Sequence, residues 1–319
     1  MEYEKMVKPV GRFAPSPTGP LHFGSLVAAV GSYCLARQGG GKWLVRIEDL
    51  DRPRVIEGAA DLILSTLEGL GFEWDEAPVY QSRRTARYEE VLARLDGGDH
   101  VFPCACSRRE ILASAPHPGE EGPVYTGTCR QGLPPGRSPR SLRLRVPGDP
   151  LAFVDGVFGE VEQCLASAVG DFILRRADGL FAYQLAVVVD DADSGVNQVV
   201  RGADLLHSTP RQIYLYACLG WPVPRYVHLP LALDTAGDKI SKRQGEVSVC
   251  RQGSGGLLLA QALRFLGQEV PAELEQAPPG EVLRWGVEHF RLDAVPHENR
   301  VAGVDESAGD CLESVRSET

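Results

Sequence analysis

The sequence lacks the features of a membrane-spanning or secreted protein. None of its apolar runs reaches the roughly 18 residues that a bilayer requires. The first residues, Met1-Glu2-Tyr3-Glu4-Lys5, have neither the charge nor the apolar core of a signal peptide. We therefore expect a soluble cytoplasmic protein, and the hydrophobic content of 43% is sufficient for a large core.

The chain also lacks a disulfide framework and a basic net charge. Its eight cysteines are unevenly spaced over 319 residues, which is typical of reduced thiols with one metal site at most. The net charge of −10 argues against a nucleic-acid partner, because phosphates attract Lys and Arg. Charge acts locally, however, and arginines gather in one third of the chain, while the tail is acidic. Any single one of these arginines could equally well belong to a solvated surface without a binding role. They are Arg83, Arg84, Arg87, Arg94, Arg108, Arg109, Arg130, Arg137, Arg140, Arg143 and Arg145.

The segment P-S-P-T-G-P-L-H-F-G-S at 15–25 predicts a phosphate site. Its prolines and Gly19 enforce a loop, and the apolar run from Leu21 to Leu35 then predicts a helix. His22 and Gly24 lie at the N-terminus of that helix, where backbone N–H groups and the helix dipole attract phosphate. Gly24 lets a nucleotide approach closely, and His22 adds a donor. A simple turn is the alternative interpretation.

The segment K-I-S-K-R at 239–243 predicts a cationic clamp. Lys239 and Lys242 flank Ser241 after the loop sequence D-T-A-G-D, which suits a flexible arm that closes over the same phosphates. Taken alone, this segment is equally well interpreted as a solvated loop.

Apolar periodicity predicts a parallel α/β arrangement. Strands at Val10–Ala14 and Trp43–Ile47 flank the first helix and form a β-α-β unit. From about 102 to 162 the composition shifts to Pro, Gly, Cys and Arg, which indicates an insertion. Apolar runs at Phe172–Leu174 and Phe181–Val189 begin the second half. Further helices are expected at Asp61–Leu70, Ala86–Leu95, Pro210–Leu219, Gly256–Leu266 and Glu281–His289.

The order and spacing of the two phosphate segments resemble the H-I-G-H and K-M-S-K-S signatures of class I aminoacyl-tRNA synthetases. They stand here as H-F-G-S at 22–25 and K-I-S-K-R at 239–243. Three more segments resemble the glutamate branch of that class: G-R-F-A-P-S-P-T-G at 11–19, R-I-E-D-L-D at 46–51 and V-V-R-G-A-D-L-L-H-S-T-P-R-Q at 199–212. Ser25 and Arg243 depart from the signatures, and Ser25 removes one potential phosphate donor.

Within that branch, the chain is similar to short paralogues that attach glutamate to queuosine in the anticodon of tRNA(Asp). Only 76 residues follow K-I-S-K-R, too few for the anticodon-binding region of the full-length enzymes. The resemblance implies a monomeric ligase. Its expected substrates are ATP with Mg²⁺, L-glutamate and queuosine-containing tRNA(Asp). The alternatives are a short glutamyl-tRNA synthetase that charges tRNA(Glu), and a non-catalytic RNA-binding paralogue.

The resemblance implies a Rossmann-like parallel-sheet catalytic domain with an inserted zinc-binding subdomain and a short helical C-terminal part. We expect the two halves of the catalytic domain at 1–102 and 166–250, the insertion at 103–165, the helical part at 251–300 and a disordered tail at 301–319.

The same resemblance implies the site residues. His22, Lys242 and Lys239 are expected to stabilise charge on the phosphates, and His22, Gly24 and Lys242 to bind ATP. Glu48 meets the α-amine of glutamate, while arginines meet carboxylates. The alternative is a surface ion-pair cluster of Arg46, Glu48, Asp49, Asp51 and Arg52, but the position of Glu48 directly after a strand favours function. The expected glutamate pocket is Arg12, Phe13, Ala14, Pro15, Ser16, Glu48, Tyr183 and Arg201.

The insertion carries three cysteines, Cys104, Cys106 and Cys129, that could supply thiolates to a tetrahedral zinc. His117 is the chemically ordinary fourth ligand, whereas the resembling enzymes have a tyrosine at the position of Tyr125, in a C-x-C and Y-x-x-x-C pattern. We follow the resemblance and choose Tyr125 for a structural zinc. The alternative is three reduced thiols without metal.

Overall fold

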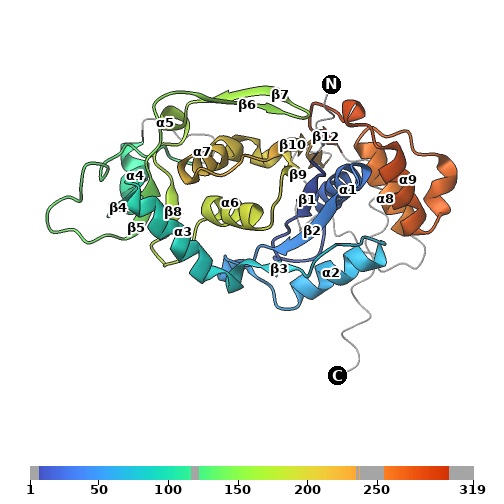
Figure 1. The fold of residues 1–319 in the computed structure, drawn as a ribbon, viewed down its shortest axis with the longest axis horizontal. Coiled ribbons are helices and arrows are strands. Elements are labelled where there is room, and N and C mark those ends of the chain that lie inside the picture. The colour runs from blue at the N-terminus through green and yellow to red at the C-terminus, as the bar shows by residue number, and fades with distance from the viewer. Residues whose placement is uncertain (1–6, 116–121, 235–236, 238–254, 302–319) are drawn as a thin grey trace.

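A parallel β-α-β unit forms the centre of the fold, as the sequence predicts (Figure 1). The computed structural model describes residues 7–115, 122–234, 237 and 255–301. Strands β1 (Val10–Phe13) and β2 (Lys42–Ile47) pair in parallel, with Val10 opposite Lys42, and α1 (Phe23–Gln38) is the crossover between them. The short strand β3 (Val79–Tyr80) extends the sheet beyond β2.

A second parallel pair lies beside the first. Strands β9 (Gln198–Gly202) and β10 (Arg225–Leu229) run in parallel. The Asn197 N–H donates to the Val10 carbonyl oxygen at 3.1 Å, and the Val10 N–H donates to Asn197 Oδ1 at 2.8 Å. These bonds connect the two halves of the chain at the start of β1, so segments far apart in sequence form one α/β unit.

The five further helices predicted from apolar periodicity are all present, and the described residues contain three α-helices that the sequence did not predict. The apolar run at 181–189 falls in a helix that buries its two central turns. The α-helices are α2 (Ala59–Gly69), α3 (Thr85–Gly97), α4 (Arg108–Ser114), α5 (Leu165–Ala168), α6 (Tyr183–Asp193), α7 (Thr209–Leu219), α8 (Gly255–Phe265) and α9 (Pro279–His289). The 3₁₀ helices are η1 (Arg52–Arg54), η2 (Gln81–Arg83), η3 (Ala203–Ser208), η4 (Ala272–Gln276) and η5 (Leu292–Ala294).

The region of the predicted insertion is antiparallel. Strand β5 (Ser141–Leu144) pairs with β4 (Val101–Cys104) on one side and β8 (Ile173–Arg175) on the other. A hairpin of β6 (Leu151–Asp155) and β7 (Gly159–Gln163) then returns to the parallel strands, where the Gly156 N–H donates to the Tyr226 carbonyl oxygen at 2.9 Å. Figure 1 shows this hairpin running from the side of β4 and β5 to β10. The region of the predicted insertion is therefore in contact with β10.

The core of the first half also includes the C-terminal helices. Helix α1 is buried along most of its length by β1 and β2 on one side and by α8 and α9 on the other. Small residues permit this approach: a Cβ at Gly31 would lie 2.6 Å from Leu229 Cδ1, and one at Gly286 would lie 3.1 Å from Cys34 Sγ. Strands β11 (Ala232–Leu233) and β12 (Arg300–Val301) pair beyond β10. In the described ranges, no helix is both long and apolar enough to cross a membrane.

Candidate active site

A cavity of about 420 Å³ opens where the parallel strands end. The residues that follow β1, β2, β9 and β10 all line it, which is where ligands bind in open α/β sheets. The cavity is lined by every residue predicted to bind the substrate glutamate, and also by His22 and Gly24. Lys239 and Lys242 lie outside the described residues, so the predicted clamp has no structural account.

The Pro-rich loop is held by backbone bonds to the segments that follow β2. The Glu48 N–H donates to the Pro15 carbonyl oxygen at 2.9 Å, and the Ile56 N–H donates to that of Pro17 at 3.0 Å. Gly19 adopts φ +139°, a conformation that a side chain would strain. The loop then delivers the chain into α1 with His22 as its N-cap. The predicted helix start is confirmed within two residues.

Ser25 contacts the ring of His22 directly. The Ser25 N–H donates to His22 Nδ1 at 3.3 Å, and Ser25 Oγ lies 3.0 Å from His22 Nε2. A Cβ at Gly24 would lie 3.3 Å from both Cε1 and Nδ1 of the same ring. Both residues therefore fix the imidazole at the N-terminus of α1, in addition to the backbone access that the sequence predicts for Gly24.

Beside this loop, a buried ion cluster joins Arg12, Arg46 and Glu48 to Asp191. Asp191 Oδ1 accepts from Arg12 Nε at 3.0 Å and from Arg46 Nη1 at 2.7 Å, and Arg46 Nη2 lies 3.5 Å from Glu48 Oε1. Arg12 and Arg46 are each 3% exposed, which excludes a surface ion pair at Arg46, whereas Asp51 does form one with the exposed Arg54. Burial alone would raise the pKa of Asp191, but the two arginines outweigh it and lower the pKa.

The pKa of Glu48 is shifted in the opposite direction to that of Asp191. Burial is the largest influence and raises its pKa, although Arg46 and Arg12 oppose that rise. Glu48 therefore shares Arg46 with two acidic residues, Asp190 and Asp191, and an approaching cation would favour its ionised form. Sequence reasoning missed both aspartates. The available signal was the V-V-V-D-D run at 187–191, which puts two acids directly after a buried helical stretch.

Arg201 is a buried cation with neutral partners. Its Nε donates to His228 Nε2 at 3.1 Å, and the side chain is 5% exposed. Its Nη1 lies 3.4 Å from the Tyr183 hydroxyl and its Nη2 lies 2.8 Å from Thr209 Oγ1. No carboxylate of the described residues forms an ion pair with it. The cavity is thus lined by Arg12, which pairs with Asp191, and by Arg201, whose charge is left for a ligand.

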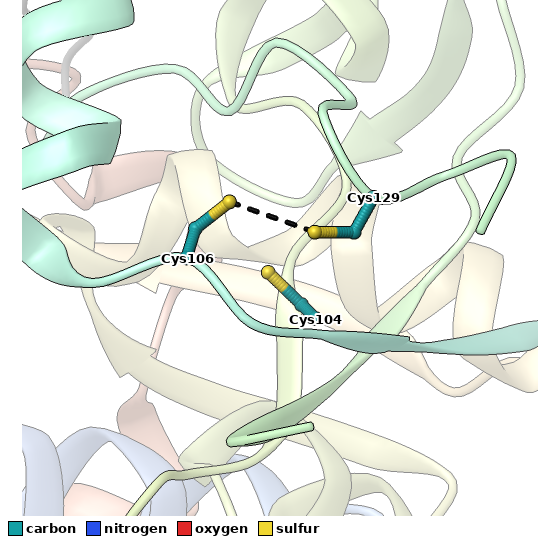
Figure 2. A group of neighbouring side chains, drawn as sticks. All are labelled: Cys104, Cys106 and Cys129. Carbon is teal, nitrogen blue, oxygen red and sulfur yellow. Dashed lines mark hydrogen bonds between the residues drawn. The ribbon is translucent and has the colours of Figure 1, made fainter. Parts of the chain in front are cut away.

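The three predicted cysteines cluster in the antiparallel region (Figure 2) and are not among the residues that line the cavity. Strand β4, which Cys104 ends, lies apart from α1 (Figure 1). Their sulfur atoms lie within 4.8 Å of one another, with Cys106 Sγ 3.6 Å from Cys129 Sγ. Tetrahedral zinc with bonds of about 2.3 Å separates its sulfur ligands by about 3.8 Å, so the three thiols fit such an ion. The Tyr125 hydroxyl lies 3.5 Å from Cys104 Sγ and 3.9 Å from Cys106 Sγ. His117 lies outside the described residues.

Comparison with known proteins agrees with this geometry. The family profile of the class I tRNA synthetase (E and Q) catalytic domain matches residues 8–277. The Glutamyl-Q tRNA(Asp) synthetase of Geobacter sulfurreducens is 56% identical over 293 residues, which cover 90% of this chain and 93% of that protein. The protein of the same name from Dechloromonas aromatica is 57% identical over 294 residues, covering 91% and 97%.

Solved structures give the same fold. A glutamate tRNA ligase from Elizabethkingia meningosepticum, in complex with its amino acid, superposes with a TM-score of 0.77 at 25% identity, over 94% of this chain and 68% of that one. Glutamate-tRNA synthetase from Elizabethkingia anophelis gives a TM-score of 0.76 at 24% identity, covering 94% and 69%. The chain therefore belongs to the class I tRNA synthetases of the glutamate and glutamine type, and within them to the glutamyl-Q tRNA(Asp) synthetase family of ligases.

Proposed function

We propose that this enzyme activates L-glutamate with ATP and transfers the glutamyl group to queuosine in the anticodon of tRNA(Asp). The observation that carries the first step is the charge arrangement of the cavity. Arg201 offers a cation without a counter-ion among the described residues, and Glu48 offers a buried acid. Glutamate has two carboxylates and one ammonium group, so it complements both charges. The names of the relatives support the second step.

In the first reaction, an oxygen of the glutamate α-carboxylate attacks the α-phosphorus of ATP. The new C–O–P bond forms as the bond between the α-phosphorus and the bridging oxygen breaks, and pyrophosphate leaves with Mg²⁺. His22 and the N-terminus of α1 would stabilise the negative charge of the phosphates. No protein nucleophile is needed. Lys239 and Lys242 stay sequence predictions for the same role.

In the second reaction, a hydroxyl of the queuosine attacks the carbonyl carbon of the mixed anhydride. An ester forms as the bond between the carbonyl carbon and the phosphate oxygen breaks, and AMP leaves with its phosphate taking up the proton of the attacking hydroxyl. The described residues of the cavity would bind and orient the glutamyl group for this attack. Tyr183 lines the cavity, and burial raises the pKa of its hydroxyl, which keeps that hydroxyl protonated.

We further propose that Cys104, Cys106, Cys129 and Tyr125 hold one structural zinc. Zinc bound there would tie β4 to the loop that carries Cys129. The Arg143 guanidinium carbon lies 3.9 Å from the centre of the Tyr125 ring, where its charge favours a phenolate, whereas burial raises the pKa of Tyr125 and opposes one. The Cys129 N–H also donates to the Tyr125 hydroxyl at 2.8 Å.

The experiment that tests the proposed function is transfer of radiolabelled glutamate, with ATP, to three RNAs: tRNA(Asp) with queuosine, tRNA(Asp) without it, and tRNA(Glu). Label on the first alone is the expected result. Label on tRNA(Glu) would replace the proposal with a short glutamyl-tRNA synthetase. Absence of label on all three, without glutamate-dependent ATP–pyrophosphate exchange, would indicate a non-catalytic paralogue.

A further inference from the structure

We propose that Asp155 and His228 are positioning residues for glutamate, acting through Arg201. This inference rests on the proposed function of the cavity and extends it to residues that do not contact the substrate. Asp155 ends strand β6, His228 lies in β10 and Arg201 lies in β9, so three strands supply one connected chain of side chains.

The contacts from Asp155 through His228 to Arg201 are unbroken and shielded from solvent. His228 Nδ1 lies 2.7 Å from Asp155 Oδ2, and both side chains are 0% exposed. On the other edge of the ring, His228 Nε2 accepts from Arg201 Nε at 3.1 Å. Asp155 Oδ1 accepts at 3.0 Å from the N–H groups of Val157 and Phe158, which fix the carboxylate within the hairpin turn.

These contacts permit one tautomer of His228. An arginine N–H can only donate, so Nε2 must be the unprotonated acceptor and Nδ1 must carry the proton that Asp155 accepts. Burial of the ring lowers the pKa of His228, which keeps it neutral. A neutral ring placed between Asp155 and Arg201 orients the guanidinium without neutralising it.

The fixed orientation leaves Arg201 a donor for a ligand. A guanidinium has five N–H bonds. Four are directed at His228 Nε2, the Tyr183 hydroxyl, Thr209 Oγ1 and, at 3.4 Å, the Leu205 carbonyl oxygen. One N–H on Nη1 has no acceptor among the described residues, and Arg201 lines the cavity. The Asp155 and His228 pair therefore determines where that donor points.

Asp155→Asn is the sharpest test, because it changes hydrogen bonding with little change of shape. The amide oxygen can still accept from Val157 and Phe158, so its nitrogen faces His228 Nδ1. A donor there moves the ring proton to Nε2, where it opposes the N–H of Arg201. Arg201 must then turn away from its present direction.

The measurement is glutamate-dependent ATP–pyrophosphate exchange with the full chain, together with the melting temperature. We expect Asp155→Asn to raise the KM for glutamate by about 10- to 100-fold, the effect of losing one oriented bond to a charged group. The kcat and the KM for ATP should stay unchanged, since glutamate binding is weakened equally in the ground and transition states. Asp171→Asn is the matched control: it alters a buried carboxylate that pairs with Arg130, far from the cavity, and should change only stability.

A double-mutant cycle separates positioning from general stability. In an Arg201→Ala background, Asp155→Asn should cause no further rise in the KM for glutamate. A further rise, an unchanged KM in the single variant, or equal changes in the KM for glutamate and ATP would each overturn the inference. If Asp155→Asn does not fold, His228→Asn replaces it. That side chain keeps the donor to Asp155 but is too short to accept from Arg201, and the same selective rise is expected.

The two proposals fail in different ways. An unaltered enzyme without glutamate-dependent exchange would overturn the proposed function and this inference together. An active enzyme whose KM for glutamate ignores Asp155→Asn would overturn this inference alone.

Discussion

The pair Ser25 and His22 shows how one substitution in a signature acts on a single side chain. Because the Ser25 N–H donates to Nδ1, a neutral His22 carries its proton on Nε2, next to Ser25 Oγ. The Ser25 hydroxyl can accept a hydrogen bond from that N–H and still donate its own O–H to a phosphate. The sequence by itself indicates the loss of a phosphate donor at Ser25. The structure adds that Ser25 also orients His22 and can itself donate to a phosphate.

Ser25→Ala should lower ATP–pyrophosphate exchange about fivefold, the effect of losing one neutral hydrogen bond of about 1 kcal/mol. His22→Ala should cost far more, about 100- to 1000-fold, because it removes the ring N–H that acts on the developing charge through the Ser25 hydroxyl and, with it, the ring that orients that hydroxyl. Initial rates at saturating glutamate would measure both. An equal loss in the two variants would contradict a supporting role for Ser25.

A second prediction at this scale concerns pH. Burial raises the pKa of Glu48, so this carboxylate takes up a proton at a higher pH than an exposed glutamate does. Protonation removes the negative charge that would face the substrate ammonium. The KM for glutamate should therefore rise as pH falls through the raised pKa, whereas the KM for ATP should not follow it.

Glu48→Gln supplies the control for that profile. It should raise the KM for glutamate above the pKa of Glu48, where the native carboxylate is ionised, and abolish the rise that follows Glu48. The neighbouring Arg46, Asp190 and Asp191 are retained in this variant, so their contributions are common to both profiles. A pH dependence that survives Glu48→Gln would assign it to another group.

At the scale of elements, the cysteine cluster links β4 to a loop that pairs poorly with the rest of the sheet. Cys104 ends β4, while Cys129 lies in a turn whose neighbour Tyr125 forms only an isolated bridge to Gly170. A metal would supply the missing connection. Cys129→Ser should therefore lower the zinc content of the purified protein and its melting temperature.

Cys218→Ser is the matched control, because Cys218 is a half-buried thiol on α7 outside the cluster. It should leave the zinc content unchanged. Metal analysis by mass spectrometry gives the result directly, and glutamate-dependent exchange should persist in both variants because the cavity lies elsewhere. A zinc-free unaltered protein would support the interpretation as three reduced thiols.

For the molecule as a whole, the arginines that are concentrated in one third of the sequence differ in their exposure and in their ion pairs. Five of those arginines form ion pairs within the chain: Arg84, Arg87, Arg130, Arg137 and Arg145. Arg108 and Arg109, by contrast, are exposed at the start of α4. With a net charge of −10, binding of an RNA backbone must depend on such local residues.

Replacing Arg108 and Arg109 together by alanine should weaken glutamyl transfer to tRNA and reduce its dependence on salt concentration. The salt slope should fall by about one for each phosphate that the protein no longer binds. Exchange without tRNA should be unaffected. The measurement is the KM for tRNA at several salt concentrations, with Arg137→Ala as a control that removes an arginine already paired with Glu110.

The sequence by itself determined the local features of this protein. Proline and glycine positions fixed the loop before α1, and apolar periodicity placed β1, β2 and most helices within a few residues. The family signatures supplied the residues that line the cavity. These features depend on short segments, where steric limits on the backbone and side-chain spacing act without the rest of the chain.

Only the tertiary structure decided which distant groups meet. Asp191 reaches Arg12 across 179 positions, and Asp155 reaches His228 across 73. The local sequence marks Asp191 only through the V-V-V-D-D run at 187–191 and does not mark Asp155, because an acid at the end of a helix or in a hairpin is usually solvated. Their burial, their charge state and their partners depend on which strands lie side by side, so the electrostatics of the cavity are a property of the assembled fold.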